Sequence, residues 1–582
     1  MSIARICWLS GPVLRARAEG PFHLREAVQV GEDALLGEVI RLNGDEILVQ
    51  VYEDTSGLRL GTQVVGTGAP LNVRLGPGVL GGIFDGLLRP LPRADSPYVQ
   101  PGLRSAAPGV FPFTPLVEPG MRLGAGATFG QLAPEQGRSQ LCLVPPGVAG
   151  EVVRIAAAGR HAEDAPLCAL RDERGVAREV AMSQVWPVRQ PRPVAARLPA
   201  QEPLHTGQRI IDALFPVARG GKAAMPGGFG TGKTILLESL ARWCNADVIV
   251  YVGCGERGNE IAGPLEEFPQ LTDPQTGRSL MERTVIIANT SNMPVSAREA
   301  SIYTGITVAE YFRDQGLHVA LMADSISRWA EALREVSGRL GELPGEGGFP
   351  AYLSSRLAEF YERAARVRTL AGAEGSVTVM AAVSPPAGDF SEPVVSHSRR
   401  YVRSFWALDT RRAQARFYPA INPLASYSED AAELAPWWRA QGNTHWSELR
   451  RRFLVLLEEQ SKLERMARII GKDALPVRQR LTLLCADLVN EAFLRQSAFS
   501  EADHFASPQR QTAMMRLLGR FVDLAEQAVA QGQAPERLTQ LDVFRKLQRM
   551  GEDIPEGQAQ GFSRLGDELE QAFAQLQANH AA

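Results

Sequence analysis

In the first part of the chain, apolar residues recur at every second position over short runs. Ile47, Val49 and Val51 are separated by single residues, so they would share one face of a strand. The triplet Asn-Gly-Asp at 43–45 separates this run from an earlier apolar one, which is typical of a β-hairpin. We therefore expect a small β-barrel at residues 1–70 that closes its own edges.

A second β-rich segment is expected at residues 110–185, where turn residues precede apolar runs such as VAGEVVRI at 148–155. A proline-rich passage follows, with proline at positions 187, 191, 193, 199 and 203. Because proline has no backbone N–H and a fixed φ, it is kept out of helix interiors and central strands. We predict an extended connector there.

From about residue 205 strand-like and helix-like segments alternate. Four runs rich in Val, Ile and Ala each end in small or polar residues, at 245–255, 283–291, 317–325 and 375–384. Amphipathic segments such as ILLESLARWC at 235–244 lie between them. Such alternation predicts an α/β core, a mostly parallel sheet covered by helices.

Beyond about residue 430 the pattern becomes helical. One apolar face recurs at spacings of three, four and seven, at Leu449, Phe453, Leu456, Leu463, Met466 and Ile470. Gly471 is a plausible helix end.

These patterns predict four parts. They are an N-terminal β-barrel (1–70), an α/β core (71–109 and 186–430), an inserted β-rich bulge domain (110–185) and a C-terminal α-helical domain (431–582).

Composition excludes several classes of protein. A length of 582 residues allows roughly three to five domains. Apolar residues make up 45% and charged residues 22%, so disorder is not the main state. A formal net charge of -3 disfavours a dedicated nucleic-acid binder, which usually carries a basic excess.

We expect neither a transmembrane segment nor a signal peptide. The chain contains no run of about 18 apolar residues, and its start lacks an apolar core followed by a cleavage site. The six cysteines form no C-x-x-C pair, which disfavours disulfides and zinc. A cytoplasmic protein is the expectation, anchored by other chains if it acts at a membrane.

Residues 227–234 (GGFGTGKT) match G-x-x-x-x-G-K-[ST] at every fixed position. Glycines let backbone N–H groups turn inward and cradle phosphate oxygens. A helix that starts near Lys233 directs the positive end of its dipole at the anion. We expect the Lys233 ammonium to reach the β- and γ-phosphates and the Thr234 hydroxyl to bind Mg²⁺. The loop predicts nucleoside triphosphate binding, contributed by Gly227, Gly228, Phe229, Gly230, Thr231, Gly232, Lys233 and Thr234.

Charged residues follow two of the predicted strands. Glu256 and Arg257 come directly after the run 248–254, where α/β sheets bind ligands. Glu256 could polarise an attacking water, although a solvated Glu-Arg pair in a turn has the same pattern. Asp324 ends the strand 317–324 and is placed like a Mg²⁺-side carboxylate acting through water, while a helix cap is the alternative. Arg328 lies four residues further on, so it could face the nucleotide or a neighbouring chain.

At these residues the sequence resembles the catalytic A subunits of V-type and archaeal-type rotary ATPases, over nearly the whole chain. The matching strings are YVGCGERGNE at 251–260, SNMPVSAREASIYTGITVAEYFRD at 291–314, DSISRWAEALRE at 324–335, PGEGGFPAYLSSRLAEFYERAARV at 344–367, VSPPAGDFSEP at 383–393 and FWALD at 405–409. The segment 110–185 also resembles the insertion that marks A subunits.

The resemblance implies a RecA-like P-loop core and ATP hydrolysis or synthesis, coupled to proton or sodium transport. It implies a ring of alternating A and B subunits, central shaft and peripheral stalk subunits, a membrane ion-translocating sector, and a location on the cytoplasmic face of a membrane. The positions matching the family's catalytic ones are Lys233, Thr234, Glu256, Arg257, Asp324 and Arg328. An arginine finger would come from the B subunit.

The resemblance also places an aromatic against adenine at Tyr418, with Phe499 as a second wall. Either ring could instead be part of a core. The sequence departs from the family pattern at Gly228, Thr231 and Val395, and at Ile326, where threonine is commoner.

Three alternatives remain at this stage. One is a type III secretion, flagellar or F-type β ATPase, which the 110–185 insertion disfavours. Another is a ring member that binds nucleotide without hydrolysing it, which Lys233, Thr234 and Glu256 disfavour. The third is a ring-shaped nucleic-acid motor, which the weakly acidic composition disfavours.

Overall fold

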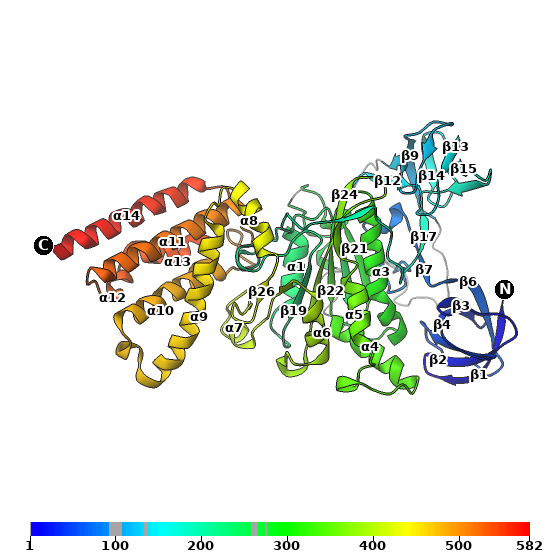
Figure 1. Cartoon of the computed structure of the whole chain (residues 1–582), viewed down its shortest axis with the longest axis horizontal. Helices are drawn as coiled ribbons and strands as arrows, with labels where there is room; N and C mark the ends of the chain where they lie inside the picture. Colours follow the sequence, from blue (N-terminus) through cyan, green and yellow to red (C-terminus); the bar gives the residue numbers. More distant parts are fainter. Residues whose placement is uncertain are drawn as a thin grey trace. The chain divides into compact units, whose positions relative to one another are not determined.

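The computed structural model describes residues 2–91, 108–132, 138–257, 263, 266–274 and 276–581 (Figure 1). The chain folds into two compact units, each assembled from separate stretches of sequence. The first unit comprises residues 1–199, 220–222 and 246–402. The second unit comprises residues 200–219, 223–245 and 403–582.

The first unit begins with a closed six-stranded barrel in the order β1-β2-β5-β4-β3-β6, shown in dark blue in Figure 1. Its strands are β1 (Ile3–Ser10), β2 (Val13–Ala18), β3 (Glu26–Val30), β4 (Leu35–Asn43), β5 (Glu46–Val51) and β6 (Gln63–Pro70). Asn43 pairs with Glu46 across the predicted hairpin, and Gly44 between them has φ +63°. Val28, Val39 and Val49 lie in the barrel core with no exposed surface. The predicted barrel is confirmed, because closure pairs its edge strands β1 and β6.

Two four-stranded antiparallel sheets follow, in the orders β10-β13-β15-β16 and β12-β11-β9-β14. Their strands are β9 (Val110–Pro115), β10 (Arg122–Leu123), β11 (Thr128–Leu132), β12 (Gln140–Leu143), β13 (Gly150–Ile155), β14 (Gly159–Ala162), β15 (Cys168–Arg171) and β16 (Ala177–Val180). Phe113, Phe129 and Leu170 lie in one apolar core to which both sheets contribute. The β-rich insertion is therefore a small sandwich.

The proline-rich passage contains two short paired strands, with a turn at residues 188–190 between them. Pro187 ends β17 (Gln184–Pro187), which pairs with β7 (Asn72–Leu75) in a two-stranded sheet. Further on, β18 (Ala196–Leu198) pairs with β23 (Ala365–Arg368). Proline is tolerated in β17 because this strand has only one partner and needs few N–H donors.

The rest of the first unit is built on a parallel sheet in the order β24-β22-β20-β21-β8. Its strands are β8 (Ile83–Phe84), β20 (Val248–Cys254), β21 (Thr284–Asn289), β22 (His318–Asp324) and β24 (Glu374–Val383). Its helices are α3 (Val295–Asp314), α4 (Ile326–Arg339), α5 (Leu353–Tyr361) and α6 (Pro393–Tyr401). All seven residues of β20 are buried, as expected for a strand covered on both faces.

A buried ionic cluster ties the barrel to this α/β part. Arg189 Nη2 lies 2.6 Å from Glu299 Oε2 on α3 and 3.3 Å from Glu38 Oε2 on β4. The Tyr52 hydroxyl also donates to Glu38. The Glu299 and Glu38 carboxylates outweigh burial and hold the pKa of Arg189 well above its usual value, so it stays charged.

The second unit contains the phosphate-loop helix and all of the C-terminal helices. Its short strands are β19 (Lys222–Pro226), β25 (Ser404–Phe405), parallel to β19, and β26 (Tyr427–Ser428), antiparallel to β25. Its helices are α1 (Lys233–Trp243), α7 (Thr410–Gln414), α8 (Ala431–Ala440), α9 (Trp446–Ile470), α10 (Val477–Val489), α11 (Pro508–Ala530), α12 (Pro535–Leu538), α13 (Asp542–Asp553) and α14 (Ala559–Ala581).

The apolar face predicted on α9 is buried along only part of its length. The helix ends at Gly471, as predicted, where φ is +88°. Phe453 and Leu463 are buried, whereas Met466 is 45% and Ile470 52% exposed. The apolar periodicity therefore predicts the helix correctly, and the apolar face of its last turns lies exposed. Among the helices of the described residues, none has the length and apolar character needed to cross a bilayer.

Candidate functional site

The phosphate loop connects β19 to α1 in the second unit. Gly230 and Gly232 have φ of +74° and +84°, a region that L side chains rarely adopt. A Cβ at Gly227 would lie 2.6 Å from Thr231 Oγ1 and 2.7 Å from Leu408 Cβ. Three of the glycines are thus required by backbone conformation or packing. α1 begins at Lys233, so the predicted helix start is confirmed and the N-terminal end of α1 lies at the loop.

Two side chains of the phosphate loop form hydrogen bonds to the backbone of the same loop. Lys233 Nζ donates to the carbonyl oxygens of Gly227 and Gly228, each at 2.8 Å. The Thr231 hydroxyl also donates to Gly228 O, at 2.8 Å, and Thr231 is buried. A phosphate oxygen is a stronger acceptor than these neutral carbonyls, so the ammonium can exchange them for a bound phosphate. Phe229, by contrast, is 87% exposed.

Thr231 supplies the first testable change. Thr231→Val keeps the shape but removes the hydroxyl that closes the loop, so nucleotide binding should weaken. A neutral hydrogen bond contributes about 0.5–1.5 kcal/mol, or roughly 2- to 13-fold in affinity. Titration with a fluorescent ATP analogue measures the effect. Thr231→Ser, which retains the hydroxyl, should restore most of the lost affinity, and equal weakening in both variants would contradict the role.

A cleft of about 470 Å³ adjoins the phosphate loop within the second unit. Gly230, Thr231 and Gly232 line it, together with the side chains of Tyr418 and Phe499. A Cβ on Gly232 would lie 3.5 Å from Tyr418 Cε1, so this ring lies against the loop. Tyr418 is 42% and Phe499 90% exposed, and neither is a core residue. The cleft thus joins a phosphate-binding backbone to two aromatic rings, as a nucleoside triphosphate requires.

Other residues of this cleft were not predicted from the sequence. Gln208, Arg416 and Arg495 also line it. Gln208 precedes a buried π-helical turn at Ile210–Leu214, and Arg495 follows another at Asn490–Leu494. No motif marks these positions, and only the fold brings them beside the phosphate loop.

The predicted acidic residues lie in the first unit, at the carboxyl ends of its parallel strands. Glu256 and Arg257 follow β20, with Glu256 half-buried and Arg257 exposed. Asp324 is the last residue of β22, is 2% exposed, and pairs in register with Gly253 on β20. The Tyr251 hydroxyl lies 3.4 Å from Asp324 Oδ2. Both carboxylates therefore belong to the same edge of one sheet, where ligands bind in α/β folds.

Arg328 and a residue that sequence reasoning missed, Arg298, flank the turn before Glu256. A Cβ on Gly255 would lie 2.8 Å from Arg298 Cδ and from Arg328 Cβ, which explains glycine at this position. Arg298 Nη2 donates to Ser291 O at 3.1 Å, and Ser291 N donates to Glu256 O at 2.9 Å. Arg298 thus braces the turn that carries Glu256. Arg328 forms an ion pair of 2.9 Å with Glu331 on the same helix.

The cysteine next to this turn is chemically inert. Cys254 has no exposed surface, and burial raises the pKa of its thiol to about 12. Burial likewise raises the pKa of Cys142 and Cys485 to about 12. Cys7 is exposed. The reactive thiolate is therefore scarce at Cys142, Cys254 and Cys485 near neutral pH.

Alkylation should accordingly be selective. With iodoacetamide at pH 8 the folded protein should be modified at Cys7, while Cys142, Cys254 and Cys485 should react only after denaturation, because about one thiol in 10⁴ is ionised at a pKa of 12. Peptide mass spectrometry measures the pattern. Modification of Cys254 as fast as Cys7 in the native protein would contradict the burial described.

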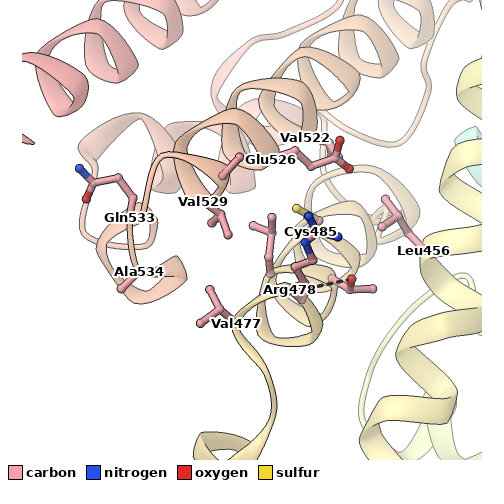
Figure 2. Close-up of a pocket in the computed structure, with 13 residues that line it drawn as sticks. Leu456, Val477, Arg478, Cys485, Val522, Glu526, Val529, Gln533 and Ala534 are labelled. Carbon is pink, nitrogen blue, oxygen red and sulfur yellow. Dashed lines mark hydrogen bonds between the residues drawn. The ribbon is translucent and has the colours of Figure 1, made fainter.

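A larger hollow, of about 730 Å³, lies among the C-terminal helices of the second unit (Figure 2). Val477 and Cys485 of α10 and Val529 of α11 contribute apolar surface, and Arg478 and Glu526 contribute opposite charges. None of the predicted nucleotide-site residues lines it. This hollow is therefore separate from the cleft beside the phosphate loop.

The oxygen donors predicted for Mg²⁺ fit that ion by their chemistry. Thr234 lies in the first turn of α1 and offers a half-buried hydroxyl. Asp324 offers a buried carboxylate at the end of β22. Mg²⁺ prefers such hard oxygen ligands and usually keeps several waters, so few protein donors suffice.

Four family models match the chain. The beta-barrel domain of the ATP synthase alpha/beta family matches residues 8–68, and the barrel-sandwich domain of ATP synthase alpha/beta subunits matches 107–189. The family's nucleotide-binding domain matches 207–428, and the C-terminal domain of V and A type ATP synthases matches 435–538. The phosphate loop and both acidic residues fall within the nucleotide-binding match.

Curated relatives resemble the chain over nearly its full length. The V-type ATP synthase alpha chain of Halothermothrix orenii is 46% identical, covering 99% of each chain. The A subunit of the A-type ATP synthase of Methanopyrus kandleri is 48% identical, covering 98% of this chain and 97% of its own. The type III secretion ATPase EscN of enteropathogenic E. coli shares the fold, with a TM-score of 0.64 at 22% identity over 88% of this chain and 99% of its own. The chain belongs to the ATP synthase alpha/beta family and, within it, to the A subunits of V-type and A-type ATP synthases.

Proposed function

We propose that this protein is the catalytic subunit of a rotary ATP synthase of the V/A type, which hydrolyses or synthesises ATP. The observation that supports this most is the cleft of the second unit, where a complete phosphate loop adjoins two aromatic side chains, Tyr418 and Phe499. Membership of the A subunits favours this function over a type III secretion or F-type enzyme, and the intact Lys233 favours it over a non-hydrolysing ring member.

The residues have distinct proposed roles. The loop's N–H groups and Lys233 bind the β- and γ-phosphates, and Tyr418 and Phe499 enclose the base. Glu256 accepts a hydrogen bond from the attacking water and orients it. Since phosphoryl transfer is mostly positioning and charge stabilisation, these groups provide most of what the chain itself can contribute.

Positive charge completes the proposed site. Arg257 and Arg328 are proposed to balance charge that develops on the transferred phosphoryl group. Thr234 and, through water, Asp324 are proposed to hold Mg²⁺, which when bound neutralises charge on the β- and γ-phosphates. A further arginine is expected from a neighbouring chain of the ring, so the isolated chain should hydrolyse ATP poorly.

The proposed assembly is a ring in which this chain alternates with B-type subunits. Central shaft and peripheral stalk subunits would join the ring to a membrane sector that moves protons or sodium ions. The chain would then be a peripheral protein on the cytoplasmic face of the membrane.

Co-purification tests this function directly. A tagged chain should recover B-type subunits, shaft subunits and a membrane ring, and the reconstituted ring should hydrolyse ATP far faster than the chain alone. Recovery of single-stranded nucleic acid on a filter, with no B-type partner, would instead indicate a nucleic-acid motor.

A further inference from the structure

One wall of the cleft is an irregular segment, residues 495–506, which we name the base loop. Phe499 lies at its exposed part, and Arg495, Gln496, Ser497 and Ala498 also line the cleft. The loop is joined to the other aromatic residue of the cleft, because Gln496 N donates to Tyr418 O at 2.9 Å. Its position therefore determines where Phe499 lies relative to the proposed base site.

Arg209 anchors the beginning of the base loop. This side chain is fully buried, and its guanidinium donates to Phe493 O at 2.7 Å and to Arg495 O at 2.6 Å. Its backbone N–H donates to Gln496 Oε1 at 2.8 Å. Three separate groups of Arg209 thus hold residues 493–496, where the base loop begins after the π-helical turn Asn490–Leu494.

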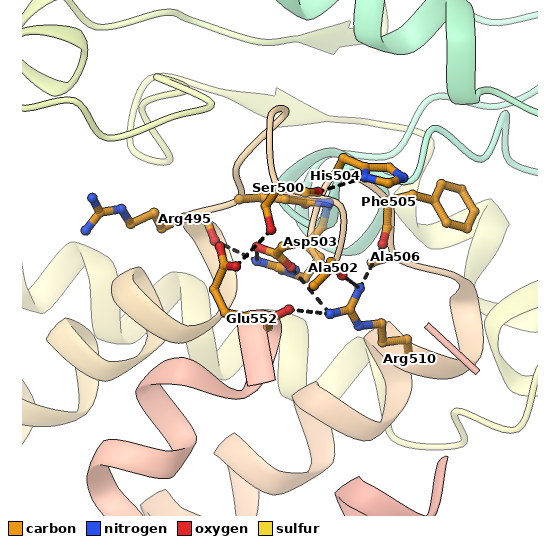
Figure 3. A network of polar contacts seen from close by, with 12 residues as sticks. Arg495, Ser500, Ala502, Asp503, His504, Phe505, Ala506, Arg510 and Glu552 are labelled. Atoms are coloured by element: carbon orange, nitrogen blue, oxygen red, sulfur yellow. Dashed lines mark hydrogen bonds and ion pairs between the residues drawn. The ribbon is translucent and has the colours of Figure 1, made fainter. Parts of the chain in front are cut away.

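Asp503 anchors the end of the base loop. Its carboxylate accepts from Arg209 Nη1, and from Arg209 Nη2 at 3.0 Å. Arg510 Nη2 lies 3.6 Å from Asp503 Oδ1, and Arg510 Nη1 donates to Ala502 O and Phe505 O, each at 2.8 Å (Figure 3). The carboxylate is 5% exposed and lies between two buried guanidinium groups.

Neighbouring residues also connect the base loop to two helices. Gln208 Nε2 lies 3.2 Å from Ser239 Oγ on α1 and 3.3 Å from His504 O. His504 stacks on Trp243, also on α1, with ring centroids 4.2 Å apart. Towards the C-terminal helices, Arg510 Nη2 donates to the carbonyl oxygen of Ile554, just beyond α13, at 3.0 Å. The loop is thus fixed both to the phosphate-loop helix and to the C-terminal helices.

We propose that Asp503 is a positioning residue for the nucleotide base. Its ion pair with Arg209 closes the base loop into a fixed arch that holds Phe499 in the lining of the cleft, to which Tyr418 also belongs. Without this closure a loop of 12 residues would sample many conformations, and the base would have to order it on binding. This proposal rests on the proposed function, and it specifies which buried group makes the cleft selective for a nucleotide over a bare polyphosphate.

Asp503→Glu is the most informative change. It keeps the charge that the two guanidinium groups need, whereas removing it would leave them unpaired and endanger folding. The added methylene would crowd this contact, because the carboxylate packs closely against Gly551, where a Cβ would lie 2.9 Å from Asp503 Oδ1. The base loop must therefore shift while the ion pair remains.

The experiment compares two ligands on the reconstituted ring. Magnesium ATP carries a base, and magnesium tripolyphosphate, used as a competitive inhibitor, does not. Stacking of a base on an aromatic ring contributes roughly 5- to 150-fold in affinity. Asp503→Glu should raise KM for ATP about tenfold, within that range, and change the inhibition constant of tripolyphosphate less than about twofold. In a Phe499→Ala background the same change should raise KM little further.

Controls separate the outcomes. Glu570→Gln breaks an exposed ion pair with Arg520 in the same helical domain and should leave both constants unchanged. If Asp503→Glu does not assemble, Ser500→Ala, which removes the loop's bond to Glu552, should show the same selective loss on a smaller scale. Equal losses for both ligands, or no loss of ATP affinity, would overturn the proposal. Absence of ATP hydrolysis and of tripolyphosphate inhibition in the wild-type ring would instead refute the proposed function.

Discussion

Glu256→Gln should abolish most ATP turnover while leaving nucleotide binding largely intact. The amide keeps the size of the side chain but cannot accept a proton or orient water as a carboxylate does. Loss of such a group typically slows a reaction about 10²- to 10⁴-fold. Steady-state hydrolysis by the reconstituted ring measures the rate, and equilibrium titration with a fluorescent ATP analogue measures binding.

The control for this variant is Glu267→Gln, the same chemical change at an exposed glutamate eleven residues further on. It should hydrolyse ATP like the unmodified ring. If Glu256→Gln also hydrolyses ATP at the wild-type rate, another group orients the water. If it loses binding and turnover together, its role is structural.

Lys233→Ala should weaken nucleotide binding and hydrolysis together. The Lys233 ammonium lies inside the phosphate loop, 2.8 Å from the carbonyl oxygens of Gly227 and Gly228. Removing it takes away both a ground-state contact and stabilisation of charge in the transition state. We expect kcat/KM for ATP to fall at least about 10²-fold, the effect of deleting one positioned donor.

Lys462→Ala provides the matched control, since Lys462 pairs with Glu458 on the exposed surface of α9. Its kcat/KM should not change. Thermal unfolding of both variants should match that of the wild type, which separates a lost contact from a misfolded loop. Normal binding and cleavage by Lys233→Ala would mean that the phosphate loop is assigned wrongly.

Much of the fold was predictable because its signals are local. The run at Val248–Cys254 is apolar throughout, as a strand buried on both faces must be. The phosphate loop is equally local, since its glycines and Lys233 lie within eight consecutive residues. The barrel was predictable from alternation and one hairpin turn around Gly44.

Other features depend on contacts between distant segments and have no local signal. In the sequence, Arg298 looks like any other charged residue of a helix. Its role in supporting the turn that carries Glu256 is visible only in the structure, where Gly255 packs against it. Arg209 and Asp503 are 294 residues apart in sequence. Burial on α9 has no local signal either, because periodicity shows which face of a helix is apolar but not whether other residues cover it. The catalytic roles of Glu256 and Asp324 stay predictions.

The buried cluster around Arg189 has a mechanical consequence. In a rotary machine some parts must resist torque while others yield to it. Arg189 joins Glu38 of the barrel to Glu299 of α3 through contacts that are out of reach of solvent ions. A force on the barrel is therefore transmitted to α3 and the parallel sheet rather than absorbed at a flexible joint, so the barrel can hold this sheet in place.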